Sequence, residues 1–357
     1  MTRHEAVLRP LLDALRSGRG FAHKRDIAHV MQGLGDRPPL GSPTAVPNGD
    51  DCAALALPGG GYHLFAIEGL MPEFVQQQPW FAGYSAVMVN LSDVAAMGGR
   101  PTAVVDALWS HESATTAQVL EGLRAACEKY GVPLVGGHTN LRGDSAQLAV
   151  AVLGHAKRLI SSFAAQPGDR ILMAVDLRGA WQGQAPFWNA STNAPAARLQ
   201  ADLAVLPELA EEGLCDAGKD ISMAGVLGTL LMLLECSGRG ATLRLDALPY
   251  PDASAGWNGW EDPSPAAHAA RLRWLSAFPS YGYVLSVRPE HAQSAMNRFT
   301  RRGIACADIG HVTPGSRLDV QLGAATLPLW DLAQEGFILA RAEAAHNAEL
   351  QRDACHA

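Results

Sequence analysis

The chain has 357 residues, of which 48% are hydrophobic and 18% are charged, and its formal net charge is −7. This length exceeds what a single hydrophobic core usually supports, so we expect two domains, and the composition excludes a disordered chain. The sequence has no dense block of lysine and arginine, which argues against a nucleic-acid groove.

The first twenty residues form a charged amphipathic segment and not an apolar one, so they do not have the pattern of a secretory signal. We expect a helix over 4–17 and a second helix that opens at 21–27. The most apolar helix candidate, 221–236, is too short and too rich in glycine to cross a bilayer. The six cysteines are scattered without zinc spacing, so we expect reduced thiols in a cytoplasmic protein.

In the first half of the chain, predicted strands alternate with helices. A Pro/Gly-rich loop over 35–51 delivers a pair of adjacent aspartates. After it we predict strands at 63–70, 101–109, 132–137 and 146–156, and helices at 80–97 and 115–130. The strand at 132–137 reads as a short buried strand that runs into a glycine turn.

A Pro-Gly turn in QPGDRIL, residues 166–172, marks the start of a second domain. We therefore expect an N-terminal domain over 1–160, a C-terminal domain over 166–330, and a helix or frayed tail over 331–357. The elements predicted in the second domain are helices at about 195–212 and 221–236 and strands near 241–247, 281–287 and 318–322. The insertion at 249–268 is rich in Pro, Gly and Trp, and long loops of this kind often serve as lids or substrate loops.

Three motifs place oxygen ligands or bare glycine backbone beside apolar runs: NGDDCA at 48–53, VNLSDVAAMGGRP at 89–101 and VGGHTN at 135–140. Magnesium takes oxygen ligands and often binds through one or two carboxylates together with substrate phosphates. The motifs therefore indicate a Mg-ATP enzyme.

Asp50, Asp51 and Asp93 are the candidate metal ligands, and Asp93 is also a candidate catalytic residue. Turn chemistry is the alternative explanation for the Asp50–Asp51 pair, and a solvent-facing helix position is the alternative for Asp93. Asn90 is three residues before Asp93 and shares its helix face, so we assign it to the nucleotide site. Glu68, at a strand end, is a further candidate metal ligand or an exposed rim carboxylate.

The segment Gly136, Gly137, His138 and Thr139 is a candidate phosphate-binding turn, because glycine lets a backbone approach a phosphate closely. The alternative is an ordinary strand-end turn. Lys24 is either a phosphate contact or surface charge. Asp220 either caps the following helix or reaches the metal or the substrate as a second catalytic residue. The sequence has no P-loop, so any ATP site must be built differently.

Together, and in this order, the motifs resemble the superfamily of aminoimidazole ribonucleotide (AIR) synthase, thiamine-monophosphate kinase, selenophosphate synthetase and the hydrogenase-maturation carbamoyl dehydratase. NGDDCA is similar to that family's G-D-D-A-A, VNLSDVAAMGGRP to its N-L-S-D-x-A-A-M-G-x-x-P, and VGGHTN to its G-G-D-T or G-G-H-T. KDISMAGVLG at 219–228 resembles its D-I-S-D-G-L, and IGHVTPG at 309–315 its closing I-G-x-V strand. The resemblance covers about residues 20–322.

The resemblance implies an α/β (α+β) protein with the two-domain PurM-like fold, in which the N-terminal sheets pair across a homodimer and the C-terminal domain is an α/β sandwich. It also implies ATP and Mg²⁺ as cofactors and a small-molecule substrate, with no role for nucleic acid or membrane. The metal, nucleotide and catalytic roles given above follow the same motif match.

Three departures from the family pattern bear on the reaction. Ile67-Glu68 stands where many relatives have Thr-Asp, His138 replaces an Asp, and Met223-Ala224 replaces Asp-Gly. Our leading hypothesis is ATP-dependent phosphorylation or activation of a carbonyl or amide oxygen, as in AIR synthase. The alternatives are a small-molecule kinase of the thiamine-monophosphate kinase type, a non-catalytic nucleotide-binding subunit, and a metal-dependent phosphohydrolase.

Overall fold

The structure is a computed structural model, and it describes residues 2–34, 44–110, 112–251 and 259–340. The chain divides into two compact units, each built around one large sheet. The five-stranded unit consists of Asp51–Leu159 and Ser191–Glu212, and the seven-stranded unit consists of Met1–Asp50, Ile160–Ala190 and the chain from Gly213 onward.

These units differ from the domains expected at 1–160 and 166–330, because the N-terminal helices belong with the second sheet. Helix α1 (Arg3–Arg16) is amphipathic, and Leu8, Leu11 and Leu15 lie on its buried stripe. This stripe packs along strand β14 (Ala325–Asp331), which lies near the other end of the chain. Conversely, residues 191–212 belong to the five-stranded unit.

The five-stranded sheet has the order β1-β2-β5-β3-β4. All neighbours are antiparallel except β3 and β4, which are parallel. The strands are β1 (Ala53–Ala56), β2 (Tyr62–Leu70), β3 (Arg100–Trp109), β4 (Leu134–Asn140) and β5 (Gln147–Ala156). The helices of this unit are α3 (Pro72–Gln77), α4 (Pro79–Ala96), α5 (Ser113–Tyr130), α6 (Ala196–Leu203) and α7 (Val205–Glu211).

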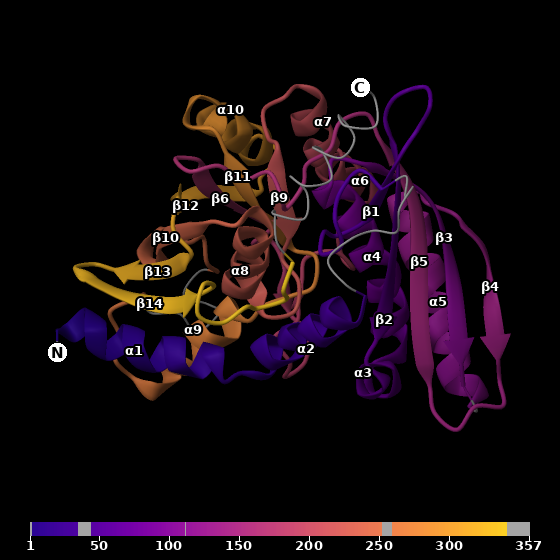
Figure 1. Cartoon of the computed structure of the whole chain (residues 1–357). Coiled ribbons are helices and arrows are strands. Elements are labelled where there is room, and N and C mark those ends of the chain that lie inside the picture. Colours follow the sequence, from indigo (N-terminus) through magenta and orange to yellow (C-terminus); the bar gives the residue numbers. More distant parts are fainter. Residues whose placement is uncertain (1, 35–43, 111, 252–258, 341–357) are drawn as a thin grey trace. The chain divides into compact units, whose positions relative to one another are not determined.

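Helices α4 and α5 lie on one face of this sheet (Figure 1). They approach each other closely because each has a glycine at the crossing. A Cβ on Gly83 would lie 2.1 Å from the Val119 carbonyl oxygen, and a Cβ on Gly122 would lie 2.0 Å from that of Trp80. No larger residue fits either position without a backbone shift, so the two glycines fix how α4 is seated.

The seven-stranded sheet has the order β14-β13-β10-β12-β6-β11-β9. Its strands, apart from β14, are β6 (Arg170–Val175), β9 (Ala217–Asp220), β10 (Gly240–Arg244), β11 (Gly282–Val287), β12 (Ala305–Thr313) and β13 (Arg317–Leu322). The unit also contains the short pair β7 (Ala180–Trp181) and β8 (Trp188–Asn189), α2 (Arg19–Leu34), α8 (Gly225–Ser237), the 3-10 turn η1 (Leu245–Ala247), α9 (Pro265–Leu275) and α10 (Pro289–Thr300).

Helix α8 is buried along its whole length, which explains why its sequence is apolar on every side. None of the helices in the described part of the chain is both long and apolar enough to cross a membrane. The five cysteines that fall within the described ranges are all free thiols.

Several expected elements differ in their details. The helix expected over 195–212 breaks at Ala204 into α6 and α7. Pro207 explains the break, because it cannot donate a hydrogen bond back to Leu203 and its ring crowds that carbonyl. Residues 332–340 are turns and not a helix, and the rest of the expected tail lies outside the described residues. Within the 249–268 insertion, α9 begins at Pro265 and residues 252–258 lie outside the description.

Candidate functional site

Helix α4 carries Asn90 and Asp93 among mostly apolar residues. It begins at Pro79, whose fixed φ suits the first helical position, and it ends just before Gly98, which has a left-handed φ of 74°. Asn90 is fully buried, and Asp93 is only 6% exposed. A buried carboxylate is costly unless it is paired or binds a cation, so the surroundings of Asp93 bear on its role.

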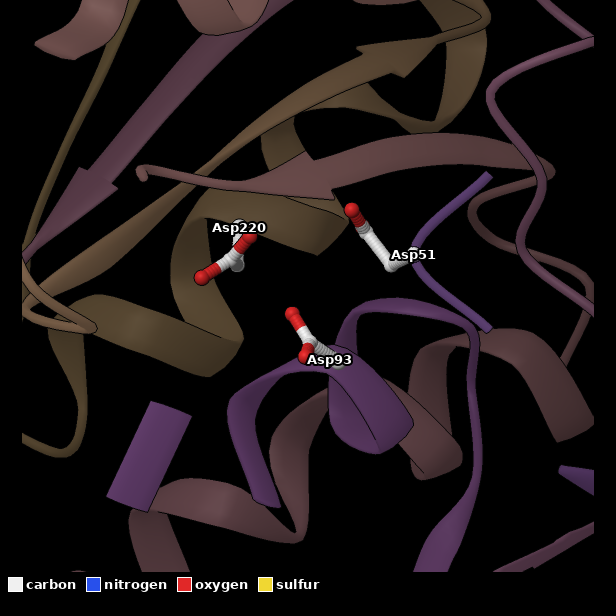
Figure 2. A group of neighbouring side chains, drawn as sticks. All are labelled: Asp51, Asp93 and Asp220. Carbon is white, nitrogen blue, oxygen red and sulfur yellow. The ribbon is translucent and has the colours of Figure 1, made fainter. Parts of the chain in front are cut away.

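Asp51 is a neighbour of Asp93 within the five-stranded unit. Each offers a carboxylate oxygen, and these two oxygens lie within 4.8 Å of one another. Asp51 comes from the bend that leads into β1, and Asp93 comes from the last turn of α4 (Figure 2). Two like charges at this separation repel each other, and a divalent cation is the simplest group that removes the repulsion.

Asn90 is fixed by only one of its two polar atoms. Its Nδ2 donates to the Ala86 carbonyl at 2.7 Å, one helical turn earlier. Its Oδ1 has no hydrogen-bond partner among the described residues, although it is buried. An unpaired buried acceptor is unfavourable, and Asn90 shares a helix face with Asp93, so this oxygen is available to a ligand.

Asp50 is engaged differently from its neighbour in the sequence. Its carboxylate accepts hydrogen bonds from the Ser161 hydroxyl at 2.6 Å and the Ser162 hydroxyl at 2.7 Å, and also from the Ser162 backbone N–H. Asp50 belongs to the seven-stranded unit, whereas Asp51 and Asp93 belong to the five-stranded unit. The metal-ligand role expected for Asp50 therefore stays a prediction, whereas its contact with the two serines is observed.

Glu68 and Lys24 are two further residues that were expected at the site, and they belong to different units. Glu68 lies on β2, is exposed, and is not among the carboxylates that group with Asp51 and Asp93. Lys24 lies half-buried on α2, in the seven-stranded unit. Their expected metal and phosphate roles stay predictions.

Residues 132–137 were expected to form a short buried strand that runs into a glycine turn. A strand is present from Leu134, but it is exposed and does not turn at the glycines, so the burial and the turn were wrong. Gly136 to Thr139 continue as extended strand β4, paired with β3 as far as Asn140, and every residue of β4 is exposed. β4 is an edge strand, so it lacks a second neighbour to cover it. Neither glycine has a positive φ.

The two glycines of β4 have different surroundings. A Cβ on Gly137 would lie 2.2 Å from an oxygen of Asp106, so packing alone requires glycine there. Gly136 has nothing closer than the Val105 side chain at 4.0 Å. His138 contacts Trp109, with ring centroids 6.0 Å apart. Burial raises the pKa of the Asp106 carboxyl above its ordinary value.

Asp220 closes β9 in the seven-stranded unit and is 3% exposed (Figure 2). It does not cap α8 with its side chain; that helix begins after Ala224, where no side chain caps it. Ala224 has a φ of 85°, a left-handed conformation that costs a non-glycine residue about 1–2 kcal/mol. Glycine, which the similar D-I-S-D-G-L motif has at this place, adopts such a conformation without that cost.

Comparisons with known proteins agree with this architecture. Residues 49–156 match the family "AIR synthase related protein, N-terminal domain", and residues 167–323 match "AIR synthase related protein, C-terminal domain". The chain belongs to the AIR synthase related family.

Relatives of this AIR synthase related chain include ATP-using enzymes. An uncharacterized protein of Synechocystis is 43% identical over 92% of this chain and 97% of its own length. A thiamine-monophosphate kinase of Synechococcus elongatus is 31% identical over 57% of this chain and 68% of its own length. The solved structure "T. maritima PurL complexed with ATP" has a TM-score of 0.64 at 20% identity, covering 81% of this chain and 46% of that one, which shows the fold.

Two structural features of this AIR synthase related chain have no counterpart in its sequence motifs. Ser161 and Ser162 hold Asp50, and their only sequence signal is a serine pair just before the Pro-Gly boundary. Asp106, in the strand that pairs with β4, was not singled out either. Both contacts connect distant parts of the chain, so no local pattern announces them.

Proposed function

We propose that this chain is a magnesium-dependent, ATP-using enzyme that phosphorylates or activates a carbonyl or amide oxygen of a small metabolite. The observation that carries the proposal is the pair Asp51 and Asp93, with carboxylate oxygens within 4.8 Å of one another. An all-oxygen donor set suits Mg²⁺, which binds proteins through one or two carboxylates and completes its shell with water and phosphate oxygens.

In this proposal Asp51 and Asp93 hold the ion, and Asp220 contributes a third carboxylate by its motif match. The bound ion would supply positive charge to the phosphates of ATP. The free Oδ1 of Asn90 accepts a hydrogen bond from a metal-bound water or from the nucleotide. Gly136, whose outer side is open, lets the exposed strand β4 approach the nucleotide.

A binding experiment tests the site before any substrate is known. Calorimetry with a non-hydrolysable ATP analogue, with and without Mg²⁺, is expected to show metal-dependent binding in the native chain and its loss in Asp93→Asn. Asp106→Asn is the matched control, because Asp106 is a half-buried aspartate of the same unit that lies outside the pair. Equal binding by native protein and Asp93→Asn would refute the metal site.

Product analysis separates the reaction classes. Free phosphate released in step with a condensed or dehydrated product supports oxygen activation, and a stable phosphorylated product supports a kinase. The 31% identity with a thiamine-monophosphate kinase supports a kinase reaction as the alternative. Binding of Mg-ATP without turnover of any candidate substrate would favour a non-catalytic nucleotide-binding subunit.

We also propose that a second copy of this chain covers the bare face of the five-stranded sheet. Phe65, Ile67, Val105 and Leu153 lie on it and are 41–66% exposed. Phe65 pairs with Leu153, while Ile67 and Val105 both pair with Ala151, so the four form one patch. Contiguous exposed apolar surface of this kind marks an interface.

Analytical ultracentrifugation tests the dimer. Ile67→Lys places a charge in the middle of the patch at an exposed position, so it is expected to give monomers that keep the native circular dichroism spectrum. A native protein that sediments as a monomer at micromolar concentration would refute the dimer.

A further inference from the structure

Two histidines lie at one end of the bare face of the five-stranded sheet. His63 on β2 is directly opposite His155 on β5, and both residues are exposed. In the next pair on this face, Phe65 is opposite Leu153, and these two belong to the apolar patch proposed as the dimer interface. Residues directly opposite each other on antiparallel strands have Cβ atoms about 4.5–5.5 Å apart. Because side chains two residues apart in a strand share a face, the two histidines border the patch.

Uncharged side chains flank the histidine pair along and across the strands. On β1, Leu55 is opposite His63. On β3, the Thr102 Oγ1 lies 3.5 Å from the His155 Nδ1. The other positions of β2 and β5 on this face, all of them described, are residues 65, 67, 69, 147, 149, 151 and 153, and none of these is charged. Neither of these two strands therefore places a negative charge beside the pair on the bare face.

Three charged groups adjoin the pair at the start of β3 and after the end of β5. Arg100 is opposite His155 and forms an ion pair with Glu211 of α7. Lys157, two residues after His155, has its Nζ 3.7 Å from the other oxygen of the same carboxylate. These groups together carry two positive charges and one negative charge, so they do not compensate further positive charge on the histidines.

A dimer that buries this face is expected to cover the histidine pair as well. The four side chains of the patch supply roughly a few hundred Å² of apolar surface, whereas each partner of a standard interface buries about 800 Å². The interface therefore extends beyond the patch, and His63 and His155 lie directly beside Phe65 and Leu153. Neutral imidazoles are acceptable at such a place, but a charged imidazolium loses hydration there and repels its neighbour.

From this arrangement we infer that acid weakens the association of two copies of this chain through the bare face. Histidine is the side chain that gains its charge between pH 8 and pH 5. When His63 and His155 both gain a proton, two positive charges lie next to each other at the edge of the apolar patch. The monomer then binds protons more tightly than the dimer does, so the association constant falls as the pH falls. This inference rests on the proposed dimer and adds its regulation.

Sedimentation equilibrium measures the dimer dissociation constant at pH 7.5 and at pH 5.5, at constant ionic strength and in EDTA. The native chain is expected to associate at least about tenfold more weakly at pH 5.5. The double variant His63→Gln/His155→Gln keeps polar side chains without the charge, so it is expected to lose most of this difference. Because the repulsion needs both charges, each single variant should lose more than half of the difference on a logarithmic scale.

Two control variants separate this pair from other histidines. His311→Gln removes an exposed histidine of β12 in the seven-stranded unit, and it should keep the native pH dependence. His138→Gln removes a histidine of the same bare face that contacts Trp109 and lies beyond the patch, and it should keep most of the dependence. Circular dichroism at both pH values verifies that each variant is folded.

The outcomes separate the dimer from its pH dependence. A native chain that is monomeric at both pH values, or a dimer that Ile67→Lys leaves intact, overturns the proposed dimer and this inference with it. A native dimer of equal affinity at both pH values overturns the inference alone. So does a pH dependence that the double variant retains, or one that His311→Gln removes to the same extent. If the double variant does not fold at pH 5.5, the two single variants decide.

Discussion

Replacing Asp93 with asparagine is expected to stabilise the metal-free protein while it removes the response to magnesium. The reason is the repulsion between Asp51 and Asp93, whose oxygens lie within 4.8 Å of one another. Two unit charges at that separation repel by about 3.5 kcal/mol at an effective dielectric constant of about 20. Hydration of Asp51, which is only partly buried, and other polar contacts offset part of this. We therefore expect a net gain of about 1–2 kcal/mol in the free energy of unfolding.

Urea unfolding in EDTA and in Mg²⁺ measures both effects. With a dissociation constant of about 1 mM, Mg²⁺ at about 10 mM should stabilise the native protein by about 1.4 kcal/mol. Asp93→Asn should gain nothing from the ion, whereas Asp106→Asn should keep the native response. The reasoning is refuted if Asp93→Asn is less stable than native protein in EDTA, or if magnesium still stabilises it.

Three further predictions concern packing and ionisation. Gly83→Ala forces a Cβ to 2.1 Å from the Val119 carbonyl and should cost at least about 3 kcal/mol in thermal unfolding, whereas Gly33→Ala, at an open helix position, should be neutral or stabilising. Burial raises the pKa of the Cys306 thiol to about 12. Alkylation of Cys306 at pH 8, followed by mass spectrometry, should therefore be about three orders of magnitude slower than alkylation of an ordinary thiol. Alkylation at the rate of a cysteine in a free peptide would contradict this. The raised pKa of the Asp106 carboxyl means that the folded state holds its proton more tightly, so stability is lost as pH rises through the folded pKa. Asp106→Asn should therefore raise the midpoint of thermal unfolding at pH 7. The difference between this variant and the native protein should vanish below the ordinary pKa of an aspartate. An equal difference at pH 3 would show that burial of the Asp106 charge is not its cause.

Much of the fold could be predicted because a long amphipathic or apolar run of residues indicates whether the segment is a helix or a strand. The helices at 3–16, 79–96 and 113–130 and the strands at 62–70, 100–109 and 147–156 agree with expectation to within two residues at each end. The short strands β7, β8 and β9 and the helices α9 and α10 were not predicted. The three strands are only two to four residues long, which is too short for a periodic pattern to show.

The sequence motifs indicated two carboxylates that the structure brings together, but they did not indicate how the neighbouring residues are arranged. Asp51 and Asp93 do approach each other, as the motifs suggested. Local sequence could not show that Asp50 turns instead to two serines more than a hundred residues later. Nor could it show that β4 stays extended, because Gly-Gly is typical of turns unless a neighbouring strand supplies hydrogen bonds.

The packing of α1 against β14 also sets an order of events during protein synthesis. The N-terminal helix is complete by residue 16, but the strand that covers its leucines begins at residue 325. At about 5–20 residues per second, this apolar stripe waits roughly 15–60 s for its native cover. All five strands of the first sheet have been made by residue 156. The segments that carry Asp51 and Asp93 are therefore made long before β14, and until β14 is made the apolar stripe of the N-terminal helix lacks its native cover.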